Sequence, residues 1–125
     1  MAIWHGEIGR KRTGGKIKIA RKKRKYELGN LPTLTRIGEE KREVEEGKGG
    51  NKKVRVLSAE FVNVSIGGKT EKLKILEVVE NKANPHFVRM GIITKGAIVK
   101  TEKGLVKITS RPGQHGVVNG ILIEA

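Results

Sequence analysis

Residues Ile92–Ile123, with the sequence IITKGAIVKTEKGLVKITSRPGQHGVVNGILI, decide how this chain folds. Three runs rich in Val and Ile fill most of it: Ile92–Thr101, Leu105–Ser110 and Val117–Ile123. Glu102-Lys103-Gly104 separates the first two runs, and Arg111-Pro112-Gly113-Gln114 separates the second from the third. Short β-branched runs bounded by Gly and Pro are typical of strands. The stretch therefore predicts a three-stranded meander with a type II turn at residues 111–114.

Upstream residues extend this pattern. Lys52–Ile66 alternates apolar and polar residues, and its phase shifts near Leu57, which predicts one strand with a β-bulge. Gly67-Gly68-Lys69 predicts a hairpin turn from which Leu73–Val79 returns as a strand. The segment Asn81–Gly91, with Asn84-Pro85, predicts a connecting loop.

The segment Thr35–Glu46 favours a helix by residue propensity, but Ile37 and Val44 are its only apolar residues. We therefore predict a polar strand at Glu40–Glu45 that leads into a Gly-rich loop. The complete pattern gives about six strands and no convincing helix. It predicts an all-β fold, either a small antiparallel barrel or a sandwich with long loops, that occupies residues 36–125.

Residues 1–35 differ from this domain and are predicted to form a basic, Gly-rich extension. Glycines are frequent before Lys16, and Arg21-Lys22-Lys23-Arg24-Lys25 is a run of five cations, which repel one another. Ile17 and Ile19 alternate with lysines and allow a short strand there. We expect the first 16 residues to lack a rigid structure of their own.

The chain carries far more positive than negative charge. Its 125 residues include 27 Lys and Arg against 13 Asp and Glu, for a formal net charge of +14, and only 3% are aromatic. Of these, 17 basic and 7 acidic residues lie within residues 1–55. Such an excess implies an anionic partner that screens it.

Several classes of protein are excluded or disfavoured. The absence of Cys rules out disulfides and thiolate metal sites, and it suits an intracellular protein. No apolar run approaches the ~18 residues of a membrane span, and the N-terminus lacks a signal-peptide core. We therefore expect a cytoplasmic protein without a membrane partner.

The sequence contains few residue patterns that are typical of a catalytic site. His5, His86 and His115 are far apart in sequence and lack metal-ligand spacing, and the chain contains no Asp. Gly68-Lys69-Thr70 resembles the end of a P-loop, but Asn63 replaces its first Gly. We expect no catalytic site, cofactor, metal or small-molecule substrate.

Cations interleaved with glycines favour binding to a polyanion, because glycines allow backbone N–H groups to approach phosphates. The candidate residues of the extension are Arg10, Lys11, Arg12, Lys16, Arg21, Lys22, Lys23, Arg24 and Lys25. Those of the second stretch are Lys48, Gly49, Gly50, Asn51, Lys52, Lys53 and Arg55. Arg89, Lys95, Arg111 and Gln114 are candidates for a smaller contact.

The kind of polyanion follows from the other residues. No recognition helix for DNA is predicted, and four aromatic residues are too few for a platform that stacks single-stranded bases. Binding to the backbone and shape of a folded RNA, with a flexible arm that orders on binding, fits best. The alternative is a chromatin-type protein that binds DNA without sequence preference. A polybasic membrane-surface module lacks an amphipathic helix or a lipidation motif.

An ordered set of motifs adds a resemblance that covers nearly the whole chain. The motifs are Trp4-His5-Gly6, Arg10-Lys11 with Thr13-Gly14-Gly15, Ala20–Lys25 with Glu27-Leu28-Gly29, Gly49–Arg55, Val79-Glu80-Asn81 with Ala83-Asn84-Pro85, Ile92–Ile98, and Thr109–Gln114 with Gly116–Asn119. Together they resemble the eukaryotic-type "S-eight-e" family of small-subunit ribosomal proteins, in its short archaeal form.

This resemblance implies a small β-barrel with basic extensions that binds small-subunit ribosomal RNA beside neighbouring small-subunit proteins, without a catalytic site or an obligatory cofactor. Asn30 and Met90-Gly91 depart from the more basic residues of the family. Glu43, Glu45 and Glu46 are more acidic than the family pattern, so we expect their strand to face away from RNA.

Overall fold

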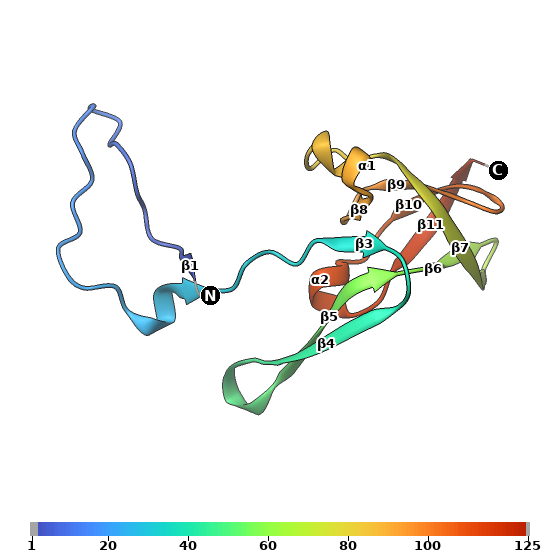
Figure 1. Cartoon of the computed structure of the whole chain (residues 1–125), viewed down its shortest axis with the longest axis horizontal. Coiled ribbons are helices and arrows are strands. Elements are labelled where there is room, and N and C mark those ends of the chain that lie inside the picture. Colours follow the sequence, from blue (N-terminus) through green and yellow to red (C-terminus); the bar gives the residue numbers. More distant parts are fainter. Residues whose placement is uncertain (1–2, 125) are drawn as a thin grey trace. The chain divides into compact units, whose positions relative to one another are not determined.

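Five strands close into a barrel in the computed structural model, which describes residues 3–124 (Figure 1). In order around the barrel they are β10 (Gly104–Ile108), β11 (Asn119–Glu124), β6 (Phe61–Ile66), β7 (Lys69–Glu80) and β9 (Ile98–Thr101). The predicted all-β barrel is therefore confirmed. Its strand pairs are antiparallel except β11 with β6, which are parallel and place Asn119 opposite Asn63.

The interior of the barrel is filled by aliphatic side chains. On β6, Val62 and Val64 are fully buried, whereas Phe61, Asn63 and Ser65 alternate with them on the outer face. The other residues buried in the same core include Leu73, Ile75, Val99, Val106 and Ile108. This two-residue period and the buried aliphatic area give the fold its stability without aromatic residues inside the barrel.

A second sheet has the strand order β4 (Lys41–Glu46), β5 (Lys52–Ala59), β3 (Thr35–Ile37) and β8 (Ile92–Ile93). The predicted polar strand at residues 40–45 is confirmed as β4. Strands β4 and β5 form a two-stranded ribbon, and the 3-10 turn η2 (Lys48–Gly50) closes its tip (Figure 1). Buried Thr35 joins β3 to β5 because its hydroxyl donates to the Val56 carbonyl over 2.7 Å.

Two predicted single strands are each divided in the structure. The prediction of one bulged strand over Lys52–Ile66 is wrong, because the chain leaves β5 at Ala59 and enters the barrel as β6 at Phe61. The phase shift marks this change of sheet. Ile92–Thr101 likewise divides into β8 and β9, with Gly96 at a φ of 87° in the turn between them.

The prediction that the chain has no helix is also wrong. Helix α1 (His86–Met90) occupies part of the expected loop, and α2 (Pro112–His115) replaces the expected type II turn. Pro112 starts α2 because its fixed φ suits a first helical position. The left-handed residue is Gly116, with a φ of 77°, and Gly113 has no positive φ.

The chain divides between Pro32 and Thr33 into two compact units. In the N-terminal unit, hereafter the basic arm, β1 (Ile3–Trp4) pairs with β2 (Leu28–Gly29), which follows the 3-10 turn η1 (Lys25–Glu27). The short strand that the alternation at residues 17–19 allows does not form in the described chain, where Arg10 and Lys16 form an isolated bridge. The arm therefore has a local structure of its own, whereas the repulsion among its cations and its glycines had led us to expect none in the first 16 residues.

None of the helices in residues 3–124 has the length and apolar character needed to cross a membrane.

Gly116 allows α2 to pack closely against Val54 of β5. A Cβ at this position would lie 2.7 Å from Val54 Cβ, so contact with the ribbon adds to the cost of the left-handed backbone. Gly91, with a φ of 68°, ends α1 in the same conformation, but a Cβ added there would meet nothing within 4 Å. A comparison of substitutions at Gly91 and Gly116 therefore separates the cost of backbone strain from the cost of steric overlap.

We predict that Gly91→Ala lowers the free energy of unfolding by about 1 kcal/mol, the cost of a left-handed non-glycine residue. Gly116→Ala adds the overlap with Val54 and lowers it by about 2 to 4 kcal/mol. Urea denaturation followed by circular dichroism measures both. Equal losses for the two variants would contradict the proposed packing of α2 on β5.

Candidate nucleic-acid interface

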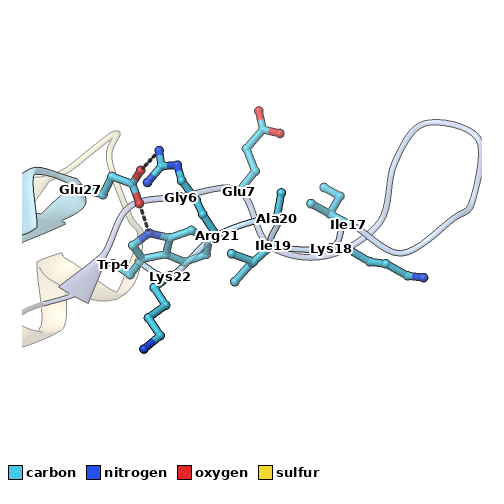
Figure 2. Close-up of a pocket in the computed structure, with 10 residues that line it drawn as sticks. All are labelled: Trp4, Gly6, Glu7, Ile17, Lys18, Ile19, Ala20, Arg21, Lys22 and Glu27. Atoms are coloured by element: carbon cyan, nitrogen blue, oxygen red, sulfur yellow. Dashed lines mark hydrogen bonds and ion pairs between the residues drawn. The ribbon is translucent and has the colours of Figure 1, made fainter. Parts of the chain in front are cut away.

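The carboxylate of Glu27 organises the basic arm. Its Oε2 accepts a hydrogen bond of 2.8 Å from Trp4 Nε1–H, and its Oε1 pairs with Arg21 Nη2 at 2.5 Å (Figure 2). The backbone N–H of Arg24 also donates to Oε2, over 3.3 Å. One acidic side chain therefore links the start of the arm, the cationic run and the turn η1.

Two glycines allow the arm to close around Trp4 and His5. A Cβ at Gly6 would lie 1.8 Å from Trp4 Cζ2, and a Cβ at Gly29 would lie 1.9 Å from His5 Nε2. Neither position can hold a larger residue without moving the ring. The ammonium group of Lys23 lies 5.1 Å from the centre of a Trp4 ring, a cation–π distance. The motifs Trp4-His5-Gly6 and Leu28-Gly29 are thus parts of one structure.

The charges around Glu27 stabilise its ionised form. The hydrogen bond from Trp4, together with those from Arg21 and the Arg24 backbone, holds the pKa of Glu27 below its ordinary value. The same contact with Glu27 raises the pKa of Arg21. The network is therefore complete at neutral pH, where both groups are charged.

The glycines of residues 9–17 form a tight turn that carries more cations. Lys11 N–H donates to the Gly15 carbonyl over 2.7 Å, and Ile17 N–H donates to the Gly9 carbonyl over 3.0 Å. Arg10 Nη1 donates to the Gly14 carbonyl over 2.9 Å. Because Gly9 and Gly14 have positive φ values of 113° and 90°, the backbone folds back within a few residues.

All nine candidate cations of the arm are exposed, from Arg10 to Lys25. Within residues 3–124, Arg21 is the one member of this set that forms an ion pair with a carboxylate. A groove of about 300 Å³ is lined by Trp4, Ile17, Ile19 and Lys22 among others, and Figure 2 draws these lining residues. The arm thus presents positive charge on a folded backbone, which is the arrangement that phosphates bind.

The second candidate stretch lies at the tip of the β4–β5 ribbon. Gly49 and Gly50 have φ values of 70° and 74°, and the Asn51 amide donates to the Lys48 carbonyl over 2.9 Å. Lys52 and Lys53 follow on β5, where they are paired in register with Glu46 and Glu45. Lys48, Lys52 and Lys53 are exposed, so the tip offers cations beside backbone that is open to a ligand.

Arg55 differs from the rest of that stretch. Its Nη2 lies 2.7 Å from Glu45 Oε2, and its Nη1 donates to Thr33 Oγ1 over 3.1 Å. Its guanidinium group therefore binds within the protein and stabilises the ribbon. The sequence does not reveal this role, because the pairing of Arg55 with Glu45 depends on the register of β4 with β5.

The four remaining candidates lie on two segments. Arg89 is on α1 and Lys95 is in the turn between β8 and β9, whereas Arg111 precedes α2 and Gln114 lies within it. The Gln114 and His115 N–H groups donate to the Arg111 carbonyl over 3.0 and 2.8 Å. Within the described chain, no hydrogen bond or ion pair joins Arg89 or Lys95 to α2.

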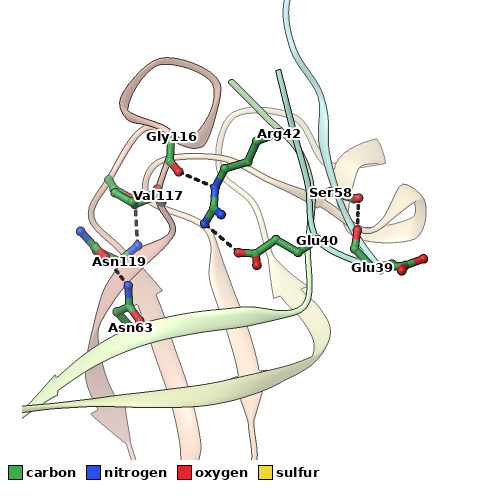
Figure 3. Close-up of polar contacts among 9 residues, drawn as sticks. Glu39, Glu40, Arg42, Ser58, Asn63, Gly116, Val117 and Asn119 are labelled. Atoms are coloured by element: carbon green, nitrogen blue, oxygen red, sulfur yellow. Dashed lines mark hydrogen bonds and ion pairs between the residues drawn. The ribbon is translucent and has the colours of Figure 1, made fainter. Parts of the chain in front are cut away.

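Arg42, which the sequence does not single out, supports α2 (Figure 3). Its Nε donates to the Gly116 carbonyl over 3.1 Å, and its Nη2 pairs with Glu40 Oε1 at 2.7 Å. Nearby, the Asn63 amide donates to Asn119 Oδ1 over 3.2 Å and joins β6 to β11 (Figure 3). These contacts fix the segment that carries Arg111 and Gln114. Sequence spacing gives no signal for them because Arg42 and Gly116 are 74 residues apart.

No group of three or more His or Glu side chains within residues 3–124 is placed to hold a metal ion.

Comparison with known proteins identifies relatives of the whole chain. The sequence profile of the family described as Ribosomal protein S8e matches residues 4–123. The chain is 54% identical to the small ribosomal subunit protein eS8 of Staphylothermus marinus, over 99% of both chains. It is 49% identical to the protein of that name from Methanospirillum hungatei, over 97% of this chain and 98% of the relative. The identity to the Nanoarchaeum equitans protein of that name is 54%, over 97% of each chain.

We predict that acidification opens the arm through Glu27. Because the folded-state pKa of Glu27 is lowered, its contribution to stability is present above the ordinary glutamate pKa of about 4.3 and is lost as pH falls through the lower folded value. Trp4 is the sole tryptophan, so its fluorescence reports this change directly.

Glu27→Gln removes the titrating group and should abolish the acid transition of Trp4 fluorescence. Glu7→Gln is the matched control, because Glu7 lines the same groove and has no hydrogen bond or ion pair within the described part of the chain. An unchanged transition in Glu27→Gln would show that Glu27 does not hold Trp4.

Proposed function

Because the chain belongs to the Ribosomal protein S8e family, we propose that it is a structural component of the small ribosomal subunit that binds folded small-subunit ribosomal RNA. The observation that carries this proposal is the set of exposed arm cations without carboxylate partners, presented on an arm with its own hydrogen-bonded structure. Each such cation that neutralises a phosphate releases a condensed counterion, which favours binding.

The form of the arm favours RNA over duplex DNA. Helices α1 and α2 contain five and four residues, which is too short to read bases from a major groove. The arm instead offers backbone turns together with long Lys and Arg side chains, which suit the converging phosphates of a folded RNA. Since the turn at residues 9–17 and the network at Glu27 are formed within the protein, less ordering entropy opposes binding.

The ribbon tip, with Lys48 to Lys53, supplies a second phosphate contact, and Arg89, Lys95, Arg111 and Gln114 supply a smaller third one. Neighbouring small-subunit proteins are proposed as further partners, because Ile121 and Ile123 of β11 are about half exposed on the outside of the barrel. The proposed location is the ribosome in the cytoplasm. We assign the chain no catalytic step, cofactor or small-molecule substrate.

We predict that replacing Lys11, Lys22 and Lys25 with Gln weakens binding to small-subunit ribosomal RNA. Loss of three phosphate contacts should reduce the slope of log K against log salt concentration by about 2 to 3. Filter binding at several salt concentrations measures both the affinity and the slope.

The matched control replaces three barrel lysines, each of which is ion-paired: Lys74 with Glu60, Lys100 with Glu77, and Lys103 with Glu71. Changing them to Gln alters net charge by the same amount, but it should change the slope much less. Equal effects of the two triple variants would show that net charge alone, and no arm contact, governs binding. Equal affinity of the wild-type chain for duplex DNA and for this RNA at physiological salt would favour a chromatin-type function instead.

We predict opposite effects for two Glu→Gln substitutions in the arm. Glu7→Gln removes a negative charge and should leave RNA affinity unchanged or slightly higher. Glu27→Gln removes the same charge but also releases Trp4 and Arg21, so affinity should fall by about fivefold. A gain in affinity for both variants, measured by the same assay, would mean that the Glu27 network does not prepare the arm for binding.

A further inference from the structure

Tyr26 is an aromatic side chain that neither the barrel core nor the phosphate contacts explain. It is the sole tyrosine, and 69% of its surface is exposed. Isolated exposed aromatic residues are common, so exposure alone indicates no function. What distinguishes Tyr26 is the way in which its neighbours are held.

The backbone on both sides of Tyr26 is fixed by hydrogen bonds. Tyr26 is the central residue of η1, and Glu27 N–H donates to the Arg24 carbonyl over 3.0 Å. His5 N–H donates to the Glu27 carbonyl, also over 3.0 Å, and the Glu27 side chain holds Trp4. The Tyr26 ring therefore projects from an anchored turn.

A second planar group lies beside the ring. The guanidinium carbon of Arg21 is 5.8 Å from the centre of the Tyr26 ring, and the same guanidinium group is tied to Glu27 at 2.5 Å. Proteins stack unpaired RNA bases on aromatic rings, of which a phenol is one, and on guanidinium planes. Here one carboxylate holds the guanidinium group and, through the Arg24 N–H, the turn that carries the ring.

The positive charges next to Tyr26 and Arg21 suit the phosphates that flank a nucleobase. Arg24 and Lys25 precede Tyr26 in the chain, and both are exposed and lack an ion pair within residues 3–124. They can contact the phosphates on either side of a stacked base. A hydrophobic segment of a protein would gain nothing from these cations.

We propose, on the basis of the function proposed above, that Tyr26 and Arg21 form a stacking site for one unpaired nucleobase of the bound RNA, with Arg24 and Lys25 on its flanking phosphates. Stacking tolerates any base, because every base has a π-face. The site therefore selects an unpaired nucleotide by its structural context and not by its identity.

The test uses the full chain and the fragment of small-subunit ribosomal RNA that it protects from nuclease. Tyr26→Leu should weaken binding roughly 5- to 100-fold, the effect of losing one base–aromatic stack, and should leave the salt slope unchanged because no charge is removed. Tyr26→Phe keeps the ring and should bind within about twofold of wild type. Ile8→Ala, at a residue with 79% exposure in the same arm, is the control and should have no effect.

A second arm of the test replaces the unpaired nucleotides of that RNA one at a time with abasic residues. Wild type should lose affinity at one position, and Tyr26→Leu should show no further loss there, which is the signature of a direct contact. If Tyr26→Leu alters Trp4 fluorescence, and hence the arm, the abasic series with wild type and Tyr26→Phe still decides the outcome. Wild-type binding that no abasic position weakens would overturn the stacking site. Absence of salt-dependent binding by the wild type would instead overturn the proposed function itself.

Discussion

Repulsion among positive charges is the constraint on which the organisation of this chain depends. A net charge of +14 in 125 residues opposes any compact state unless the cations are either paired or kept apart from the core. The two units meet this constraint in different ways. In the barrel, Lys74, Lys100 and Lys103 are each paired with a glutamate, and most of the buried side chains are aliphatic. In the arm, Arg21 is the one cation that pairs with a carboxylate among the described residues, and we propose that an external anion screens the others.

A single carboxylate gives the arm its structure in place of a hydrophobic core. Glu27 joins Trp4, Arg21 and the Arg24 backbone, and the small size of Gly6 allows the chain to close over the indole ring. A negative charge inside a phosphate-binding segment would weaken binding if only Coulomb forces between protein and RNA mattered. Its use here is explained if a preformed arm lowers the entropic cost of binding by more than one charge costs.

Local sequence patterns predict the barrel in outline but not the structure of the arm. Alternation of Val and Ile correctly predicts that these segments are β-structure, because burial on one face of a sheet requires a two-residue period. The pattern cannot show that Lys52–Ile66 changes sheets near Glu60, since a bulge gives the same phase shift. Pro112 and Gly113 suit a turn or the start of a helix equally well, and only the contact of Gly116 with Val54 and Arg42 shows which one forms. The hydrogen bond of Trp4 to Glu27 spans 23 residues, beyond the reach of any periodicity. Arg21 and Tyr26 are close in sequence, but their arrangement depends on the pairing of Arg21 with Glu27, which no periodic pattern predicts.

We propose that these unpaired cations are tolerated because the chain resides in a folded ribosomal RNA. Sedimentation of native cell extract through a sucrose gradient, after a wash in high salt, tests this claim most directly when each fraction is probed for the chain. We expect the chain to migrate with the small ribosomal subunit and to be retained there after the wash. The proposed phosphate contacts of the arm and the ribbon tip, together with the contacts of the barrel, would have to break at once for the chain to dissociate. Recovery of the chain solely at the top of the gradient, apart from the small subunit even at physiological salt, would contradict this claim.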